Sequence, residues 1–202
     1  MEIDKNNLPV MEMFYSLQGE GYYSGSPAFF IRIGGCDVGC GWCDVKESWD
    51  HDNHNILKIS KIIDNIDKKT KIVVITGGEP LMWDMTEITK KLKEKNLKRH
   101  LETSGTYDIS GDWDWICLSP KKRKLPRKNL YQIANELKII IYNKHDLVFA
   151  VEESKKVSSK CKLFLQPEWG KFDKINGKVV DFVKNNPRWT LSLQTHKFLG
   201  ID

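Results

Sequence analysis

The stretch AFFIRIGGCDVGCGWCD, residues 28–44, joins an apolar run to three closely spaced cysteines. Residues 28–33 are rich in β-branched and aromatic side chains, which favour a strand. Two glycines follow this run, and Cys36, Cys40 and Cys43 then stand at the spacing C-x3-C-x2-C. The stretch therefore predicts a strand that runs directly into a loop carrying three thiol ligands.

Three thiols in eight residues indicate an iron–sulfur site with an open position. Iron–sulfur clusters are held by cysteine thiolates, usually four. The two other cysteines, Cys117 and Cys161, lie far away in apolar runs, where a buried structural thiol is the ordinary interpretation. Three ligands on a [4Fe–4S] cluster leave one iron open for chemistry.

Two other metal sites are compatible with cysteine-rich loops. A structural zinc knuckle would take a fourth ligand such as His51 or His54, but zinc ligands mostly come in C-x2-C pairs. A ferredoxin-like electron carrier would need a fourth cysteine nearby, and the sequence places none there.

Strand-like and helical patterns alternate along the rest of the chain. The expected strands are 28–33, 71–75, 99–102, 115–118, 137–141, 162–165 and 190–193. The expected helices are 59–66, 86–96, 147–158 and 179–185, the first from isoleucines at helical spacing. Strands separated by helices indicate parallel βαβ units. The predicted class is α/β, in a single domain spanning residues 1–202.

Polar, turn-prone residues follow the expected strands. In barrel-like parallel sheets the carboxyl ends of the strands share one face, and that face carries the site. A complete eight-fold barrel typically takes about 250 residues, whereas this chain has 202. A partial, shortened TIM-like βα barrel is therefore expected, with its site at this rim.

Composition limits the other function classes. Residues 1–9 show no signal-peptide pattern, and no apolar run approaches the ~18 residues of a membrane span, so a cytoplasmic protein without membrane contact is expected. The net charge is +5, and six of the eight residues 121–128 are basic. We interpret this run as a solvated loop beside a site for an anionic small molecule. It contains no aromatic residues for stacking on nucleic acid.

Two motifs together resemble the radical S-adenosylmethionine (SAM) superfamily. They are C-x3-C-x2-C with Trp42 before the last cysteine, and TGGEP at residues 76–80. The resemblance implies a [4Fe–4S] cluster on Cys36, Cys40 and Cys43, with SAM bound at the open iron. It also implies reductive cleavage of SAM to an adenosyl radical that abstracts hydrogen from a substrate.

Further segments narrow the resemblance to one family. YSLQGEG (15–21), PAFFIR (27–32), CDVKESW (43–49) and LQTHK (193–197) are similar to 7-carboxy-7-deazaguanine synthases, lyases of queuosine and 7-deazapurine biosynthesis. The resemblance implies that 6-carboxy-5,6,7,8-tetrahydropterin is contracted to 7-carboxy-7-deazaguanine with loss of ammonia, SAM being regenerated. It also implies a homodimer and an electron donor such as a flavodoxin.

The family pattern assigns site residues by position. The implied substrate contacts are Leu17, Gln18, Gly19, Glu20, Arg32, Thr76 and His196. The implied SAM contacts are Trp42, Cys43, Asp44, Gly78, Glu102, Ser104, Ser119, Pro120, Lys121, Gln166, Pro167, Glu168 and Trp169. An arginine suits this site, because a guanidinium grips a carboxylate with two parallel hydrogen bonds. Without the family pattern, Arg32 would be interpreted as a surface residue.

The chain departs from that family at two places. Members carry Thr or Ser two residues after the last cluster cysteine, where the hydroxyl contacts a Mg²⁺ ion bound with the substrate. Here the residue is Val45, which offers no oxygen to a hard cation. Our hypothesis is that Lys46 supplies the missing positive charge. The second departure is the ending Gly200-Ile201-Asp202, where members tend to end in proline.

Two alternative functions remain at this point. One is a radical SAM activase that installs a glycyl radical on a partner protein, although the SLQGEG and QTHK segments have no place in it. The other is a non-enzymatic iron–sulfur or zinc module that binds RNA through residues 121–128. The second alternative predicts RNA affinity that falls steeply with salt, and no cleavage of SAM.

Overall fold

A single mixed sheet runs through the computed structural model, which describes residues 4–201. The nine strands of this part of the chain are ordered β3-β1-β2-β4-β5-β6-β7-β8-β9. Their bounds are β1 Asn7–Leu17, β2 Pro27–Ile33, β3 Asn55–Lys58, β4 Ile72–Gly77, β5 Lys98–Thr103, β6 Trp115–Leu118, β7 Glu136–Ile141, β8 Lys162–Pro167 and β9 Trp189–Leu191. From β2 to β9 every pairing is parallel, whereas β1 pairs antiparallel with both β2 and β3.

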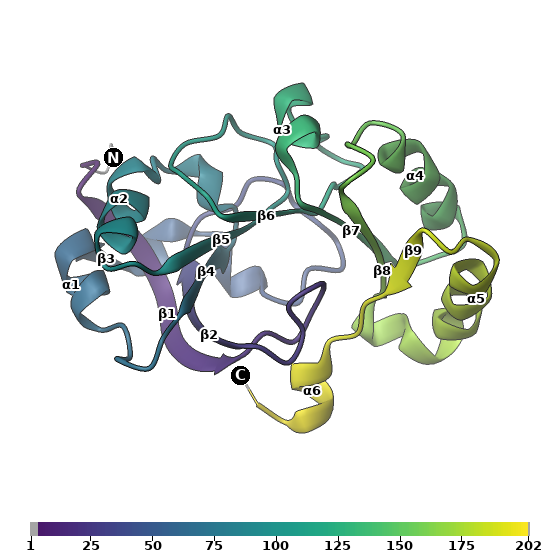
Figure 1. The fold of residues 1–202 in the computed structure, drawn as a ribbon, viewed down its shortest axis with the longest axis horizontal. Coiled ribbons are helices and arrows are strands. Elements are labelled where there is room, and N and C mark those ends of the chain that lie inside the picture. Colours follow the sequence, from purple (N-terminus) through teal and green to yellow (C-terminus); the bar gives the residue numbers. More distant parts are fainter. Residues whose placement is uncertain (1–3, 202) are drawn as a thin grey trace.

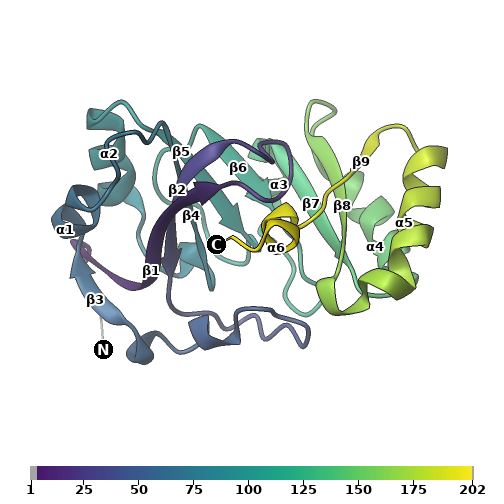
Figure 2. The ribbon, with the colours of Figure 1, turned by 90° about the horizontal axis from the view of Figure 1, so that it is seen from below.

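Helices α1 to α5 cover the outer side of this sheet, which curves as an open arc rather than closing, and α6 lies at the opening of the arc (Figure 1). Their bounds are α1 Ile59–Asp64, α2 Thr86–Glu94, α3 Lys128–Ile133, α4 His145–Ser154, α5 Phe172–Asn185 and α6 Thr195–Leu199. Short 3-10 helices occupy Lys46–Ser48, His51–Asn53, Pro80–Met82 and Trp169–Lys171. The turned view shows α6 lying beside the β1–β2 hairpin, although the two are far apart in sequence (Figure 2). The α/β class and the partial barrel are confirmed.

Successive side chains along each strand point alternately into the apolar core and into the interior of the barrel. Side chains two residues apart on a strand lie on the same face. One face supplies the apolar core under the helices, and it includes Ile31, Ile75, Leu101, Leu118 and Leu165, all fully buried. The opposite face points into the arc and carries polar and charged groups, as described below.

Several expected boundaries are wrong. The strand expected at 190–193 is β9, which begins and ends earlier, at Trp189 and Leu191. Of the expected helices, α4 ends at Ser154 rather than 158, and α5 begins at Phe172 rather than 179. The sequence analysis also missed β1, β3, α3 and α6. Among the described residues, no helix is both long and apolar enough to cross a membrane. Asp202, in the ending that the sequence analysis singled out, lies outside the described residues.

A candidate cluster and cofactor site at the mouth of the partial barrel

The three cysteines of residues 36–43 line one cavity of about 350 Å³ at the carboxyl ends of the strands. Each thiol is partly exposed, so each can reach a ligand in the cavity. Burial raises the pKa of the Cys36 and Cys40 thiols above the ordinary value. These thiols therefore need the positive charge of bound iron to hold them as thiolates. No three His, Cys, Asp or Glu side chains in residues 4–201 are grouped to hold a single metal ion.

Backbone hydrogen bonds hold the cysteine loop against its neighbours. Gly35 N donates to Ser48 O at 2.6 Å, and Cys36 N donates to Trp49 O at 3.0 Å. Glu79 N, from the TGGEP segment, donates to Gly35 O at 2.8 Å. The two motifs that the sequence analysis singled out are therefore in direct contact.

The basic run 121–128 is exposed over most of its length and is also tied to the cysteine loop. Arg123 Nη1 donates to Gly39 O at 2.8 Å, and Lys124 Nζ lies 2.7 Å from Asp37 Oδ2. Lys121 lines the cavity, and burial lowers the pKa of its ammonium. Lys122 pairs with Asp146. The run is therefore a largely exposed loop beside the site, as we interpreted it, and its contacts also tie it to the cysteine loop.

The buried carboxylate of Glu79 organises the end of β5. It accepts from Leu81 N at 3.1 Å, from Thr103 Oγ1 at 2.5 Å and from Ser104 N at 2.8 Å, and it also accepts from the Ser104 hydroxyl. A carboxylate offers about four acceptor sites, and these four donors occupy them. Glu79 thus fixes the two strand ends that border the cavity, with no group left to act on a ligand.

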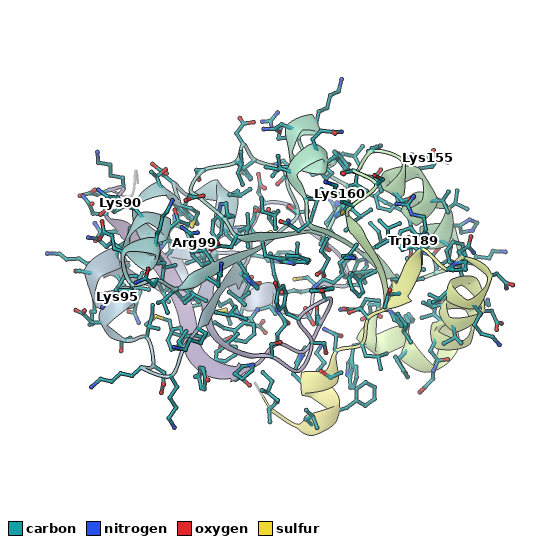
Figure 3. All side chains as sticks on the ribbon, viewed as in Figure 1. Lys90, Lys95, Arg99, Lys155, Lys160 and Trp189 are labelled. Carbon is teal, nitrogen blue, oxygen red and sulfur yellow. The ribbon has the colours of Figure 1, made fainter. Side chains whose placement is uncertain are left out.

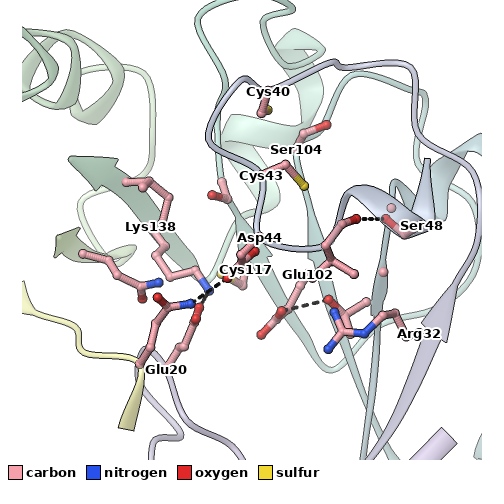
Figure 4. A pocket seen from close by; sticks show the side chains of 18 of the residues that line it. Glu20, Arg32, Cys40, Cys43, Asp44, Ser48, Glu102, Ser104, Cys117 and Lys138 are labelled. Carbon is pink, nitrogen blue, oxygen red and sulfur yellow. Dashed lines mark hydrogen bonds and ion pairs between the residues drawn. The ribbon is translucent and has the colours of Figure 1, made fainter. Parts of the chain in front are cut away.

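Glu102 lies deeper in the cavity and joins two strands and a loop. Its Oε1 accepts from Gln18 Nε2 and its Oε2 from Thr76 Oγ1, both at 3.0 Å. Gln18 Oε1 in turn accepts from Glu20 N at 3.0 Å. This network holds the side chains of Gln18, Thr76 and Glu102 around one region of the cavity, and Figure 4 shows Glu102 in that region.

Arg32 stands on the interior face of β2, where it lies opposite Glu12 of β1. Its Nε donates to Glu12 Oε1 at 2.5 Å, and its side chain is 21% exposed. The bond uses Nε, so the outer edge of the guanidinium, with its two terminal nitrogens, faces away from Glu12. This edge is the part that can bind a carboxylate with two parallel hydrogen bonds.

Glycines of the 18–26 loop allow other side chains to approach. A Cβ on Gly19 would lie 2.0 Å from Nδ1 of His196, so a larger residue would push the imidazole away. Thr195 N donates to Gly19 O at 2.9 Å, which docks α6 on this loop. Burial lowers the pKa of His196, and neutral imidazole is therefore favoured at pH 7.

Nearly all the residues assigned from the sequence line this cavity. They are Leu17, Gln18, Gly19, Glu20, Arg32, Cys36, Cys40, Trp42, Cys43, Asp44, Thr76, Gly78, Glu102, Ser104, Ser119, Lys121, Gln166, Glu168, Trp169 and His196. Pro120 and Pro167 are buried and are not among the residues that line it. A prolyl ring at these two positions packs into the chain instead and shapes the strand ends.

The sequence analysis missed several lining residues. Lys138 and Cys117 come from the middle of strands, and Gln194 and Lys197 come from the segment at α6. Gln194 Nε2 and Lys197 Nζ both donate to Asp44 Oδ2, at 3.1 and 2.6 Å. Burial raises the pKa of Asp44, but these donors outweigh it and hold the pKa below the ordinary value. A lysine within the apolar run 137–141 was the available signal for Lys138.

The histidines considered as zinc ligands have other partners. His54 Nε2 lies 2.9 Å from Glu47 O, and the His51 ring packs edge-on against Trp83 at 5.2 Å. The donor set at the loop is therefore three soft thiolates from one segment. This set suits an iron–sulfur cluster.

Comparison with known proteins identifies the family. Residues 30–118 match the Radical SAM superfamily. The 7-carboxy-7-deazaguanine synthase of Flavobacterium psychrophilum is 58% identical over 96% of this chain and 92% of that protein. The synthase of Synechocystis is 47% identical, over 96% of this chain and 93% of that protein.

A solved structure agrees with these sequence matches. The crystal structure of QueE from Escherichia coli has a TM-score of 0.81 and 29% identity, and covers 93% of both chains. The glycyl-radical activase and the non-enzymatic RNA-binding module are therefore set aside. The chain belongs to the 7-carboxy-7-deazaguanine synthase family of the radical SAM superfamily.

Proposed function

We propose that this chain is a radical SAM carbon–nitrogen lyase that converts 6-carboxy-5,6,7,8-tetrahydropterin to 7-carboxy-7-deazaguanine with loss of ammonia. The proposal extends the 58% identity to a named synthase over nearly the whole chain. The observation that carries it is a single cavity lined by both the three cysteines and the polar residues 17–20, Arg32, Thr76 and His196. The chain would work as a single domain, because one sheet spans it.

The donor set fits the two cofactors of this chemistry. Cys36, Cys40 and Cys43 would hold a [4Fe–4S] cluster, and SAM would lie along Trp42, Asp44, Gly78, Ser104, Ser119, Gln166, Glu168 and Trp169. When bound, these groups supply the one-electron chemistry that removes a hydrogen atom from the substrate. The protein positions the reactants and excludes water from them.

The substrate residues provide complementary polar groups. The Arg32 guanidinium would bind the substrate carboxylate. Gln18, Glu20 and Thr76 would bind the donor and acceptor edge of the pterin, and Glu102 orders Gln18 and Thr76 for this purpose. His196, neutral at pH 7, can donate from one ring nitrogen and accept at the other.

Val45 stands where members of the family carry the hydroxyl residue that binds Mg²⁺, so the reaction here would proceed without that ligand. Val45 lines the cavity and offers no oxygen, whereas Lys46 is not among the described lining residues. The positive charges around the cavity are Arg32, Lys121, Lys138 and Lys197. Our hypothesis about Lys46 stays a prediction. It would be contradicted if Mg²⁺ raised turnover many-fold after the enzyme had been treated with a chelator.

The remaining assignments rest on the family resemblance alone. We infer a homodimer, reduced by a flavodoxin-like donor, in the cytoplasm. Size-exclusion chromatography with light scattering tests the dimer.

The experiment that tests the proposed reaction is anaerobic turnover of the cluster-loaded protein with 6-carboxytetrahydropterin, SAM and dithionite. Mass spectrometry should show 7-carboxy-7-deazaguanine. A C36A variant is the control, and it should bind less iron and form no product. If deoxyadenosine formed without 7-carboxy-7-deazaguanine, the radical SAM chemistry would be supported and the proposed substrate would be contradicted.

A further inference from the structure

Two charged side chains of β7 face the interior of the barrel. Glu136 and Lys138 are two residues apart, so they lie on the same face of the strand. Both are buried, and the side chain of Lys138 is only 6% exposed. A buried ammonium is costly unless a carboxylate and hydrogen bonds compensate it. Its partners therefore indicate why the chain keeps a lysine here.

Lys138 is paired with Glu20 of the 18–26 loop, which joins β1 to β2. Lys138 Nζ donates to Glu20 Oε2, and the side chain of Glu20 is 15% exposed (Figure 4). The two residues are 118 positions apart in sequence, and the pair is a contact across the barrel. Glu20, in turn, lines the cavity among the residues assigned to the substrate.

Charged and titratable groups from every neighbouring element face this pair. They are Glu102 of β5, Cys117 of β6, Lys121 after β6, Glu136 of β7 and His196 of α6. Burial lowers the pKa of Lys138, but the surrounding carboxylates outweigh it and raise the pKa well above the ordinary value. The lysine therefore stays charged at any pH at which the enzyme works.

The positive charge on Lys138 determines the protonation state of the Glu20 carboxyl group. Burial raises the pKa of Glu20, but Lys138 and hydrogen bonds from Gln166 and Gln194 outweigh it, so the pKa lies below the ordinary value. An ionised carboxylate only accepts hydrogen bonds, whereas a protonated one also donates. A pterin edge offers Glu20 two N–H donors side by side, which require the ionised form.

We propose that Lys138 is a positioning residue that holds Glu20 ionised and oriented to accept the N–H donors of the substrate's pterin edge. The inference rests on the proposed function, because it takes the pterin as the ligand of Glu20. Lys138 itself would contribute no atom to the reacting centre. Its role would be in substrate affinity rather than in the binding of SAM.

A purely structural role for Lys138 makes a different prediction. The 18–26 loop has further anchors, because Gly21 N donates to Ser192 Oγ at 3.0 Å and Tyr22 N donates to Glu136 Oε2 at 3.1 Å. The loop therefore does not depend on Lys138 alone. Removal of the Lys138 ammonium should therefore change the protonation state and the orientation of the Glu20 carboxylate while the loop stays in place.

The test compares K138M, K138R, E20Q and the double variant K138M/E20Q as cluster-loaded enzymes. In K138M, KM for 6-carboxytetrahydropterin should rise roughly 10- to 100-fold, as expected when a buried charge loses its partner. The acid limb of the kcat/KM profile should move to higher pH, and the Kd for SAM should stay unchanged. K138R should keep the wild-type acid limb. The control is K160M, which removes an exposed lysine just before the start of β8 (Figure 3).

The double variant separates positioning from independent effects. If Lys138 acts through Glu20, K138M/E20Q should be no worse than E20Q, because the two changes disable one unit. The double variant removes both members of the ion pair, so it supplies a second measurement if K138M does not fold. The proposal would be overturned if K138M kept the wild-type KM and the wild-type acid limb. It would also be overturned if the effects of K138M and E20Q on KM were additive in the double variant. A wild-type enzyme that does not convert the pterin would overturn the proposed function as well.

Discussion

Gly78 lies so close to Gly35 that a Cβ on Gly78 would come within 2.2 Å of the Gly35 carbonyl oxygen. The same Cβ would lie 3.0 Å from the Cβ of Cys36. The TGGEP segment and the cysteine loop therefore pack backbone against backbone. This contact sets the distance between the cluster ligands and the residues assigned to SAM.

A methyl group at position 78 should separate these two segments. We expect G78A to bind less iron and to lose roughly 100-fold in turnover, since a displacement of about 1 Å near reacting groups can cost that much. Iron analysis and anaerobic turnover measure the two effects. G41A, in the cysteine loop, is the matched control, because a Cβ on Gly41 meets nothing within 4 Å. Equal iron content in the two variants would contradict this account of the contact.

Exchange of the Glu102 carboxylate for an amide should disorder the substrate residues. E102Q would place an NH₂ group against Gln18 Nε2 or the Thr76 hydroxyl, both of which now donate to Glu102. A misplaced buried polar group costs about 1–3 kcal/mol, so kcat/KM for the pterin should fall roughly 10- to 100-fold. E152Q, on the exposed face of α4, is the control. Kinetics of E102Q within twofold of the wild type would show that the network does not order the site.

The conformation of Gly21 should matter for stability more than that of Gly25. Both have positive φ values, 63° and 86°, so alanine is strained at either position. A Cβ on Gly21 would lie 2.0 Å from Glu136 Oε1, whereas one on Gly25 meets nothing within 4 Å. Glu136 cannot easily move, because it accepts from Tyr22 N. We expect G21A to lose about 2–3 kcal/mol of unfolding free energy and G25A about 1 kcal/mol.

Urea unfolding of both glycine variants measures this difference. Equal losses would mean that Glu136 adapts to the added methyl group. The loop would then not be held in the way that the structure indicates.

The buried His100 should make the protein less stable in weak acid. Burial lowers the pKa of His100 to about 4 from an ordinary value of 6.5. The unfolded chain therefore binds a proton between these values that the folded chain does not, so stability falls as the pH drops below about 6.5. Between pH 7.5 and 5.5 we expect His100 to account for a loss of about 1.4 kcal/mol.

A phenylalanine at position 100 would keep the aromatic packing against Tyr23, whose ring centroid is 4.5 Å away. The dependence of unfolding free energy on pH should be weaker in H100F by this amount. An unchanged dependence would show that His100 takes up its proton in the folded state.

The parallel part of the fold could be predicted because its strands are short runs of β-branched residues bounded by turns. β6 was predicted with its observed bounds, Trp115–Leu118. β1 escaped prediction because most of its side chains are only half-buried, so its apolar pattern is weak. The first half of α5 was missed because it contains polar residues and Gly177, a poor helix former.

The rim of the site could also be predicted, because each strand end carries a recognisable motif. Cys117 and Lys138, which lie within strands and outside these motifs, could not. Alternation shows that Glu136 and Lys138 share a face of β7, but not whether that face meets helices or the cavity. Nor does the sequence show that Lys138 reaches Glu20, which depends on how the open sheet curves (Figure 1).

The measurement that tests the central claim most directly is a count of SAM and product in the same anaerobic reaction. Wild-type enzyme with limiting SAM and excess 6-carboxytetrahydropterin should form many molecules of 7-carboxy-7-deazaguanine for each SAM lost. This result would establish the substrate, the product and the catalytic use of SAM together. Loss of SAM to methionine and deoxyadenosine, with the pterin recovered unchanged, would contradict the account.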